Sequence, residues 1–364
     1  MSTPRLTNGE MAIDLRGVAK TYGRKVKALR GVDMQVGRGE VFGLLGPNGA
    51  GKSTLVKILM TVIRASHCEG HVLGHPVGHK PTLTNVGYLP EHHKFPDYLT
   101  GAQVLDFYGA LGGADRATRK SRQSDLLELL GMSKWATTRV RKYSKGMRQR
   151  TGIAQALMND PDLVLLDEPT DGVDPVGRRD IREVVMELRN RGKTVFINSH
   201  LLSELEMVCD RVAILVQGDV VAQGTIDELT ADQVRYEIEF TAPEQGPDSI
   251  AKALPSAVQR TEDDHVSRFS SGLARRATYH GELATGEVLE VREDRVAIGT
   301  LDPAAVQPIL DGLRAHGVVI RSVRPVRPSL EDLFMQAVTD PSTGETLKPG
   351  AASSGTTPRK RGEA

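Results

Sequence analysis

Residues 46–53 read Gly-Pro-Asn-Gly-Ala-Gly-Lys-Ser and match the pattern G-x-x-x-x-G-K-[ST]. The apolar run Val41–Leu45 precedes this segment and the helical run Thr54–Met60 follows it, so it joins a predicted buried strand to a predicted helix. In that setting the glycines let backbone N–H groups turn inward around a phosphate, and the helix N-terminus adds partial positive charge. Lys52 is expected to reach the β- and γ-phosphates of a nucleotide, and the Ser53 hydroxyl to ligate Mg²⁺.

Residues 12–224 continue this rhythm of strands and helices. Short, branched runs bounded by turn residues recur at Leu163–Leu166, Val195–Asn198 and Val212–Val216, as is typical of buried strands. Between the first two of these runs, Ile181 begins an apolar face with the spacing i, i+3, i+4, i+7. Strand, helix and strand in this order predict an α/β fold with a largely parallel sheet. Residues from about 92 to 160 lack strand alternation and are predicted to form a helical subdomain.

Two adjacent carboxylates, Asp167 and Glu168, follow the apolar run Leu163–Leu166. Nucleotides bind at the carboxyl edge of parallel sheets, where a buried strand would deliver both side chains. Asp167 is expected to hold Mg²⁺ through water, and Glu168 to polarise the water that attacks the γ-phosphate. The predicted nucleotide contacts from the glycine-rich loop are Gly46, Pro47, Asn48, Gly49, Ala50, Gly51, Lys52, Ser53 and Thr54.

Composition excludes several classes of protein. The 364 residues carry 47 Lys and Arg against 46 Asp and Glu, so a net charge of +1 supplies no overall attraction to nucleic acid. Two cysteines argue against a disulfide scaffold and fit a reducing compartment. No run of 18 apolar residues occurs, so we expect no transmembrane helix, and any membrane role would come through a partner.

A second region follows the α/β part. Residues 225–340 alternate along Val234–Phe240 and show a helix face from Val306 to Leu313, which predicts a small α+β accessory domain. Residues 1–11 are expected to form an N-terminal extension. Residues 341–364, rich in Gly, Ser, Thr and Pro, are expected to form a disordered tail.

The order of five motifs indicates a family. After the glycine-rich loop come Tyr88-Leu89-Pro90-Glu91, then Tyr143-Ser144-Lys145-Gly146-Met147, then Asp167-Glu168, then Asp171-Gly172-Val173-Asp174, then Ser199-His200. This order resembles the nucleotide-binding subunit of an ATP-binding cassette (ABC) transporter, over roughly residues 12–224. The resemblance implies a P-loop NTPase fold of the ABC ATPase type.

The resemblance also assigns roles to single residues. Tyr22 is similar to the aromatic residue that stacks on adenine, with Val26 nearby. Ser144-Lys145-Gly146 resembles the signature segment, which in this family contacts the γ-phosphate of ATP held by the opposite subunit. His200 resembles the switch histidine that positions the attacking water, and Asp174 the acid of the loop that communicates across the dimer.

The chain departs from the usual family pattern at three positions. Glu91 stands where the family usually has Gln; its oxygen can still ligate Mg²⁺, but it adds negative charge beside the phosphates. Lys145 and Met147 stand where Gly and Gln are usual. These departures resemble the exporter-type branch known as ABC-2, in which the ATPase is a separate polypeptide. The motif Ser329–Phe334 resembles the C-terminal domain often attached in that branch.

The resemblance thus implies an ATP-hydrolysing motor subunit of an exporter, which uses ATP and Mg²⁺. Its expected partners are a separate integral membrane permease and a second ATPase subunit, in a homodimer or a heterodimer, and no nucleic acid is expected. The expected location is the cytoplasmic face of the cell membrane, as a peripheral subunit.

Two other hypotheses are open. A soluble ABC ATPase acting on nucleic acid or ribosomes usually has two cassettes or long coiled coils, whereas this chain has one phosphate loop, no heptad run and balanced charge. A regulatory cassette that binds ATP without turnover is disfavoured by the presence of Glu168 and His200.

Two histidine-containing segments are weaker candidates. His67, His71, His75 and His79 show the i, i+4 spacing of a helical metal site, but intervening Gly and Pro residues predict a strand and a turn instead. His92, His93, Phe95 and Tyr98 follow Glu91, and form either a plain surface loop or a contact for the membrane partner.

Overall fold

The computed structural model describes residues 11–23, 25–231, 234–241, 250, 254, 258–260, 279–282, 286–292, 294–339 and 347. The described residues form two compact units, which meet in the sequence between Thr225 and Ile226, and the second unit ends at Leu347. Apart from Met11 and Leu347, the predicted N-terminal extension and the predicted disordered tail lie outside the described residues. Within the described ranges, no helix combines the length and apolar character needed to cross a membrane.

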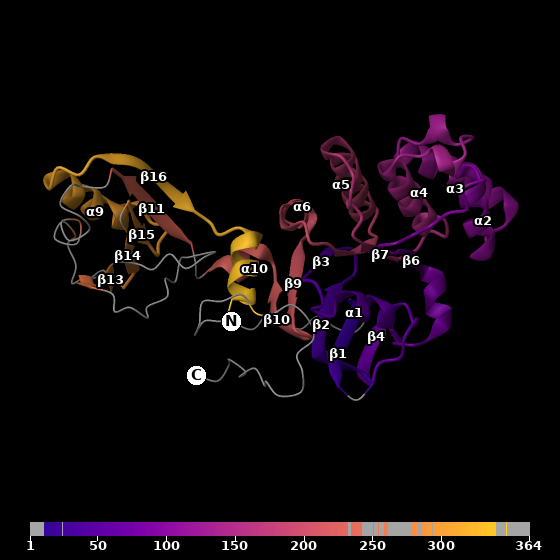
Figure 1. Cartoon of the computed structure of the whole chain (residues 1–364), viewed down its shortest axis with the longest axis horizontal. Coiled ribbons are helices and arrows are strands. Elements are labelled where there is room, and N and C mark those ends of the chain that lie inside the picture. The colour runs from indigo at the N-terminus through magenta and orange to yellow at the C-terminus, as the bar shows by residue number, and fades with distance from the viewer. Residues whose placement is uncertain are drawn as a thin grey trace. The chain divides into compact units, whose positions relative to one another are not determined.

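The first unit contains two sheets (Figure 1). A four-stranded antiparallel sheet has the order β2-β1-β4-β5, with β1 Met11–Tyr22, β2 Val26–Gly37, β4 His67–Val72 and β5 His75–Pro76. A six-stranded sheet has the order β10-β9-β3-β8-β7-β6, with β3 Val41–Leu45, β6 Val86–Leu89, β7 Leu163–Asp167, β8 Thr194–Asn198, β9 Arg211–Val216 and β10 Asp219–Gly224. Its strands are parallel except β10, which forms an antiparallel hairpin with β9.

The predicted strands of the parallel sheet are confirmed, and so is the predicted α/β fold class. The sequence interpretation missed β1, β2 and β6. In β1, Leu15, Val18 and Ala19 pair across two register shifts against β2, so bulges disturb the alternation from which a strand is recognised.

The first unit also contains helices. They are α1 Lys52–Leu59, α2 Gly101–Leu111, α3 Arg116–Leu129, α4 Lys145–Leu157, α5 Pro175–Asn190 and α6 Leu202–Val208, with short 3₁₀ helices at Lys80–Asn85, Ser133–Trp135 and Val140–Lys142. Helix α2 begins with a capping box between Thr100 and Gln103. Helices α2, α3 and α4 all fall within residues 92–160 and gather on one side of this unit (Figure 1).

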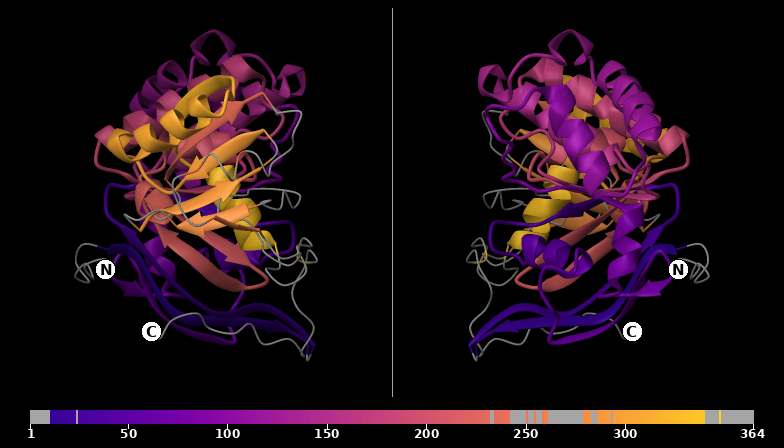
Figure 2. Two further views of the ribbon diagram at one scale, coloured as in Figure 1. Left: turned by 90° about the vertical axis from the view of Figure 1, so that its left-hand side faces the viewer. Right: turned by 90° about the vertical axis from the view of Figure 1, so that its right-hand side faces the viewer.

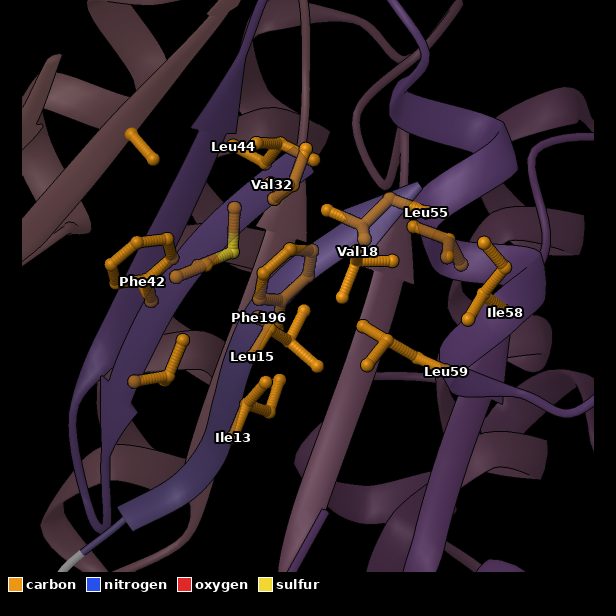
Figure 3. Packing of buried hydrophobic residues seen from close by; sticks show 14 of the residues in the cluster. Ile13, Leu15, Val18, Val32, Phe42, Leu44, Leu55, Ile58, Leu59 and Phe196 are labelled. Carbon is orange, nitrogen blue, oxygen red and sulfur yellow. The ribbon is translucent and has the colours of Figure 1, made fainter. Parts of the chain in front are cut away.

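The core of the first unit lies between the two sheets and α1. Figure 3 shows Ile13 and Leu15 of β1 facing Phe42 of β3, Phe196 of β8 and Leu55 of α1. All five side chains are fully buried, and the two phenylalanine rings stack with their centroids 5.8 Å apart. Because α1 is packed into this core, the glycine-rich loop before it is held at the carboxyl end of β3.

The second unit is an antiparallel sheet with helices. Its strand order is β12-β13-β14-β15-β11-β16, with β11 Arg235–Phe240, β12 Val258–Arg260, β13 Tyr279–Glu282, β14 Val288–Val291, β15 Arg295–Ile298 and β16 Ile320–Val326. Its helices are α7 Ile226–Thr230, α9 Pro303–Ala315 and α10 Leu330–Val338. Helix α9 packs against this sheet (Figure 2). Its Ile309 and Leu313 join Ile238 and Phe240 of β11 in a buried cluster.

Close packing between β6 and α4 yields a first prediction. A Cβ atom at Gly87 would lie 2.3 Å from the carbonyl oxygen of Ala156 and 2.9 Å from Cγ of Pro161. Gly87→Ala is therefore expected to lower the free energy of unfolding by about 1–3 kcal/mol, as overpacking typically does. Urea unfolding would measure the change, with Ser124→Ala on the exposed face of α3 as the control. A Gly87→Ala protein as stable as the parent would contradict this packing.

Candidate active site

The glycine-rich loop connects the end of β3 to the start of α1. Gly49 and Gly51 adopt φ angles of +78° and +113°, which favour glycine. At Gly46, a Cβ atom would lie 2.3 Å from the carbonyl oxygen of Leu215, so only glycine fits between the loop and β9. The Lys52 ammonium folds back and donates to the carbonyl oxygen of Gly46 at 2.6 Å. This geometry holds the cation over the concave side of its own loop, where a phosphate chain would bind.

The first carboxylate lies at the carboxyl edge of the parallel sheet, as predicted. Asp167 ends β7 and pairs in register with Asn198, which ends β8. The Asn198 amide donates to a carboxylate oxygen of Asp167, while the buried Oδ1 of Asn198 has no partner among the described residues. Sequence reasoning treated Asn198 only as the end of a strand. The sequence did carry a signal for this residue. Asn198 is a polar residue at the end of an apolar strand, and it stands two positions before His200.

The second carboxylate pairs with the predicted switch histidine. Glu168 Oε2 lies 2.7 Å from Nδ1 of His200 and 3.4 Å from the hydroxyl of Ser199. The Glu168 backbone has a φ angle of +51°, unusual for a residue with a side chain, and its N–H donates to the carbonyl oxygen of Asn198 at 2.8 Å. The buried Gln149 of α4 donates to the Glu168 carbonyl at 3.1 Å. These bonds hold a strained backbone in place, which is a common feature of functional sites.

The acidic groups crowd one another. Burial raises the pKa of Asp167, and repulsion from Glu91 and Glu168 adds to the rise, against the Asn198 hydrogen bond and Lys52. Burial lowers the pKa of Lys52, which the charges of Glu168, Asp167 and Glu91 oppose. Burial, together with Asp167 and Glu91, raises the pKa of Tyr88 to about 12. The site therefore concentrates negative charge that a cation would relieve.

The oxygen donors suit Mg²⁺. Asp167, Glu91 and Glu168 contribute carboxylates, and Ser53 contributes a hydroxyl, which are the hard ligands that Mg²⁺ prefers. Across the described part of the chain, no set of three or more His, Cys, Asp or Glu side chains is arranged to hold a metal alone.

Most of the predicted nucleotide residues share one cleft. Tyr22 and Val26 line it with 42% and 48% of their surfaces exposed, and the Tyr22 hydroxyl lies 3.5 Å from the hydroxyl of Thr54. An exposed aromatic ring at the cleft wall is suited to stacking on a base. The cleft is lined by Tyr22, Val26, Ala28, Asn48, Gly49, Gly51, Lys52, Ser53, Thr54, Glu91, Glu168 and Asn198. Of these residues, Ala28 and Asn198 were absent from the predicted set.

The signature segment and the communication loop do not line this cleft. Ser144 is the N-cap of α4, where its hydroxyl accepts from the N–H of Met147 at 3.2 Å. Asp174 is the N-cap of α5 and accepts from the N–H of Gly177 at 2.6 Å. Lys145 and Gly146 form the first turn of α4. One chain thus assembles the cleft, while Ser144, Lys145, Gly146 and Asp174 stand outside its lining.

The histidine segments have local roles. His67 and His71 lie in β4, and His75 lies in β5, so strand geometry replaces the helical spacing of a metal site. His93 Nδ1 lies 3.3 Å from the Pro90 carbonyl oxygen, and its Nε2 lies 3.2 Å from that of Arg148. The ring therefore bridges the segment before Glu91 and helix α4, a contact that neither sequence interpretation anticipated.

The crowding at Asp167 leads to a second prediction. Because its folded-state pKa is raised, this carboxyl stabilises the fold only while it is protonated, below its ordinary pKa of 3.8, and that contribution is lost as pH rises through the raised value. Asp167→Asn keeps an oxygen for the Asn198 hydrogen bond. It is therefore expected to raise the melting temperature at pH 7 without nucleotide, with the gain shrinking toward pH 4. Asp97→Asn, which changes an exposed aspartate, serves as the control. An Asp167→Asn protein less stable than the parent at pH 7 would contradict the unfavourable crowding of Asp167 by Glu91 and Glu168.

Comparisons with known proteins agree with this geometry. The model of the ABC transporter family matches residues 29–171. An uncharacterized ABC transporter ATP-binding protein of Synechocystis sp. is 38% identical over 315 residues, covering 86% of this chain and 79% of the relative. The daunorubicin resistance ATP-binding protein DrrA3 of Streptomyces coeruleorubidus is 35% identical over 309 residues, covering 84% of this chain and 96% of the relative.

A solved structure of the ATP-binding subunit of an ABC transporter has a TM-score of 0.56 and 27% identity, covering 60% of this chain and 92% of that one. The two sequence relatives match more residues than the first unit contains, so the likeness continues into the second unit. With the cleft of Lys52, Glu168 and Tyr22 in place, these matches give one conclusion: the chain belongs to the ABC transporter family, as an ATP-binding subunit with ATPase activity.

Proposed function

We propose that this chain is the ATP-hydrolysing motor of an exporter and works with a separate integral membrane permease. The observation that carries the proposal is the cleft lined by Lys52, Asn198 and Glu168, whose carboxylate also contacts His200. The similarity to a daunorubicin resistance ATP-binding protein supports export as the direction. The proposed location is the cytoplasmic face of the membrane, where the permease would hold the subunit.

The residues suggest how the chain would hydrolyse ATP. The Tyr22 ring would stack on the base, while Lys52 and the loop N–H groups would neutralise the β- and γ-phosphates. Glu168 would accept the proton of the attacking water, and His200 would orient the Glu168 carboxylate and the water. Ser53, Asp167 and Glu91 would hold Mg²⁺, which supplies charge neutralisation at the transferring phosphate when bound.

Two copies are proposed to complete each other's site. Ser144 opens α4, so its hydroxyl and the N–H groups of the first turn form a polar, electropositive end. That end is absent from the lining of the cleft that this chain forms with Lys52. A second subunit could therefore place it on the γ-phosphate, and ATP binding would then favour the closed pair through a population shift.

The helical subdomain offers a surface for the permease. Tyr98, Phe107, Leu111 and Trp135 are large apolar residues with between 47% and 73% of their surfaces exposed. Exposed apolar residues on one subdomain are typical of a docking surface for another protein. The permease is the partner that the family relationship supports.

A pull-down from native membranes tests the proposal. Tagged protein would be solubilised in detergent, and its partners identified by mass spectrometry. A polytopic membrane protein in stoichiometric amount would support the transporter motor. Phe107→Glu should abolish its recovery, while Val221→Glu, on the exposed face of β10, should not. That pair of results would place the permease contact on the helical subdomain. Ribosomal or DNA-repair proteins without any polytopic protein would overturn the proposal.

A further inference from the structure

The first turn of α4 and the loop after Glu168 are joined by an ion pair. Lys145 Nζ donates to Asp171 Oδ2 at 2.7 Å, with the two side chains 60% and 51% exposed. An exposed ion pair of this kind contributes little to stability by itself. Whether it positions the loop therefore depends on the packing around it. Both residues belong to motifs already singled out, the signature segment and the communication loop.

Packing beneath the pair indicates a fitted contact. Gly172 has a φ angle of +62°, and a Cβ atom there would lie 2.1 Å from Nζ and 2.5 Å from Cδ and Cε of Lys145. The lysine stem therefore lies directly over the Gly172 backbone. A Cβ at Gly146 would lie 3.6 Å from Cγ1 of Val173, whose side chain is buried. The alkyl chain and the helix start together cover the loop.

A second contact follows one helical turn later. Gln149, four residues after Lys145 and on the same face of α4, donates to the Glu168 carbonyl at 3.1 Å. Arg150 donates to Asp180 of α5 at 2.7 Å, beyond the loop. Helix α4 thus makes three polar contacts with the segment from the catalytic carboxylate to α5. Of these contacts, the one made by Lys145 lies nearest to Ser144, at the end of α4 that is proposed to face the partner subunit.

The charge pattern favours this pairing. The hydrogen bond from Lys145 lowers the pKa of Asp171, with smaller contributions from Lys145, His200 and His92 as charges, so the acid is ionised over the neutral range. Lys145 therefore pairs with an anion of the same chain, the Asp171 carboxylate, on the loop that lies against α4.

We propose that Lys145 is a positioning residue that ties the loop 171–174 to the signature helix of the same chain, so that both segments reach the partner subunit's nucleotide as one rigid piece. The contact lies within one chain, but its effect on the partner subunit's nucleotide rests on the proposed function. It also explains the departure of Lys145 from the glycine usual in the family, because a glycine could not make the Asp171 contact.

A double-mutant cycle tests the tie. Lys145→Ala, Asp171→Ala and the double variant would be compared by hydrogen exchange of the amides of residues 170–174, without nucleotide. Each single variant is expected to speed exchange about 2- to 5-fold, the range set by an exposed ion pair, and the double variant to add nothing further. Arg191→Ala, which breaks an ion pair of 2.8 Å and similar exposure at the end of α5, is the matched control and leaves this loop unchanged. Additive effects, or no effect, would overturn the proposal.

A second measurement separates positioning from nucleotide binding. In the Glu168→Gln background, Lys145→Ala and Asp171→Ala should weaken ATP-dependent dimerisation by equal factors, and the charge swap Lys145→Asp with Asp171→Lys should restore part of it. In the active protein, both should lower kcat with little change in KM for ATP. A loss with Lys145→Ala alone would assign Lys145 to the phosphate and overturn the tie. If the Glu168→Gln protein itself fails to dimerise with ATP, the proposed function fails, while the exchange cycle still decides this inference.

Discussion

Replacing Glu168 with Gln is expected to reduce ATP turnover by about 10²- to 10⁴-fold, the usual effect of losing a general base. Glutamine keeps the size of the side chain and can still accept a hydrogen bond from His200, which lies 2.7 Å from the carboxylate, but it cannot take a proton from water. ATP binding should be retained because Lys52 and the glycine-rich loop are untouched. The variant should therefore accumulate as an ATP-bound dimer, visible by sedimentation or size-exclusion chromatography.

The control for this experiment is Glu206→Gln, which changes an exposed glutamate of α6. It should leave both turnover and oligomeric state as in the parent protein. Unchanged turnover in Glu168→Gln would show that another group accepts the proton, and would remove the catalytic role proposed for this carboxylate.

Lys52→Ala is expected to weaken ATP binding by about 10²- to 10⁴-fold, because hydrogen bonds to charged groups contribute about 1.5–3 kcal/mol each and this ammonium would make at least two to the phosphates. The side chain is almost fully buried and points at the carbonyl oxygens of Gly46 and Pro47. Its ammonium is therefore already in place and would pay little to reorganise. Titration with a fluorescent nucleotide analogue measures the loss.

Lys57→Ala is the matched control, because Lys57 lies on the same helix α1 with its side chain exposed. It should bind ATP as the parent does. If Lys52→Ala bound ATP with parental affinity, the cleft would not be the nucleotide site, and the Glu168 experiment would lose its basis as well.

Contiguous motifs were the predictable part of this site. The glycine-rich loop, the Asp167-Glu168 pair and the strands on which they stand were all identified, because each depends on neighbouring residues with a strong period or a fixed spacing. The role of His200 as the switch histidine was implied by the family resemblance, whereas its pairing with Glu168 is seen only in the structure. The role of Asn198 was missed, because it depends on strand register: β8 lies beside β7, and the two last residues of these strands are partners.

Parts of the fold were equally beyond sequence reasoning. The antiparallel sheet that carries Tyr22 and Val26 is bulged, so its strands do not alternate cleanly, and β6 is only four residues long. The bridge made by His93 and the close approach of Gly87 to α4 join residues that are distant along the chain. No local pattern encodes such contacts.

The sequence by itself determined that this chain has a strand, a phosphate loop and a helix, followed by a carboxylate strand in an α/β fold, because local spacing and period are sufficient for these elements. Only the tertiary structure decided which strand lies beside Asp167, which anion pairs with Lys145, and which predicted residues share the cleft. Those outcomes depend on strand order, register and helix packing, which arise from burying one common core rather than from any single segment.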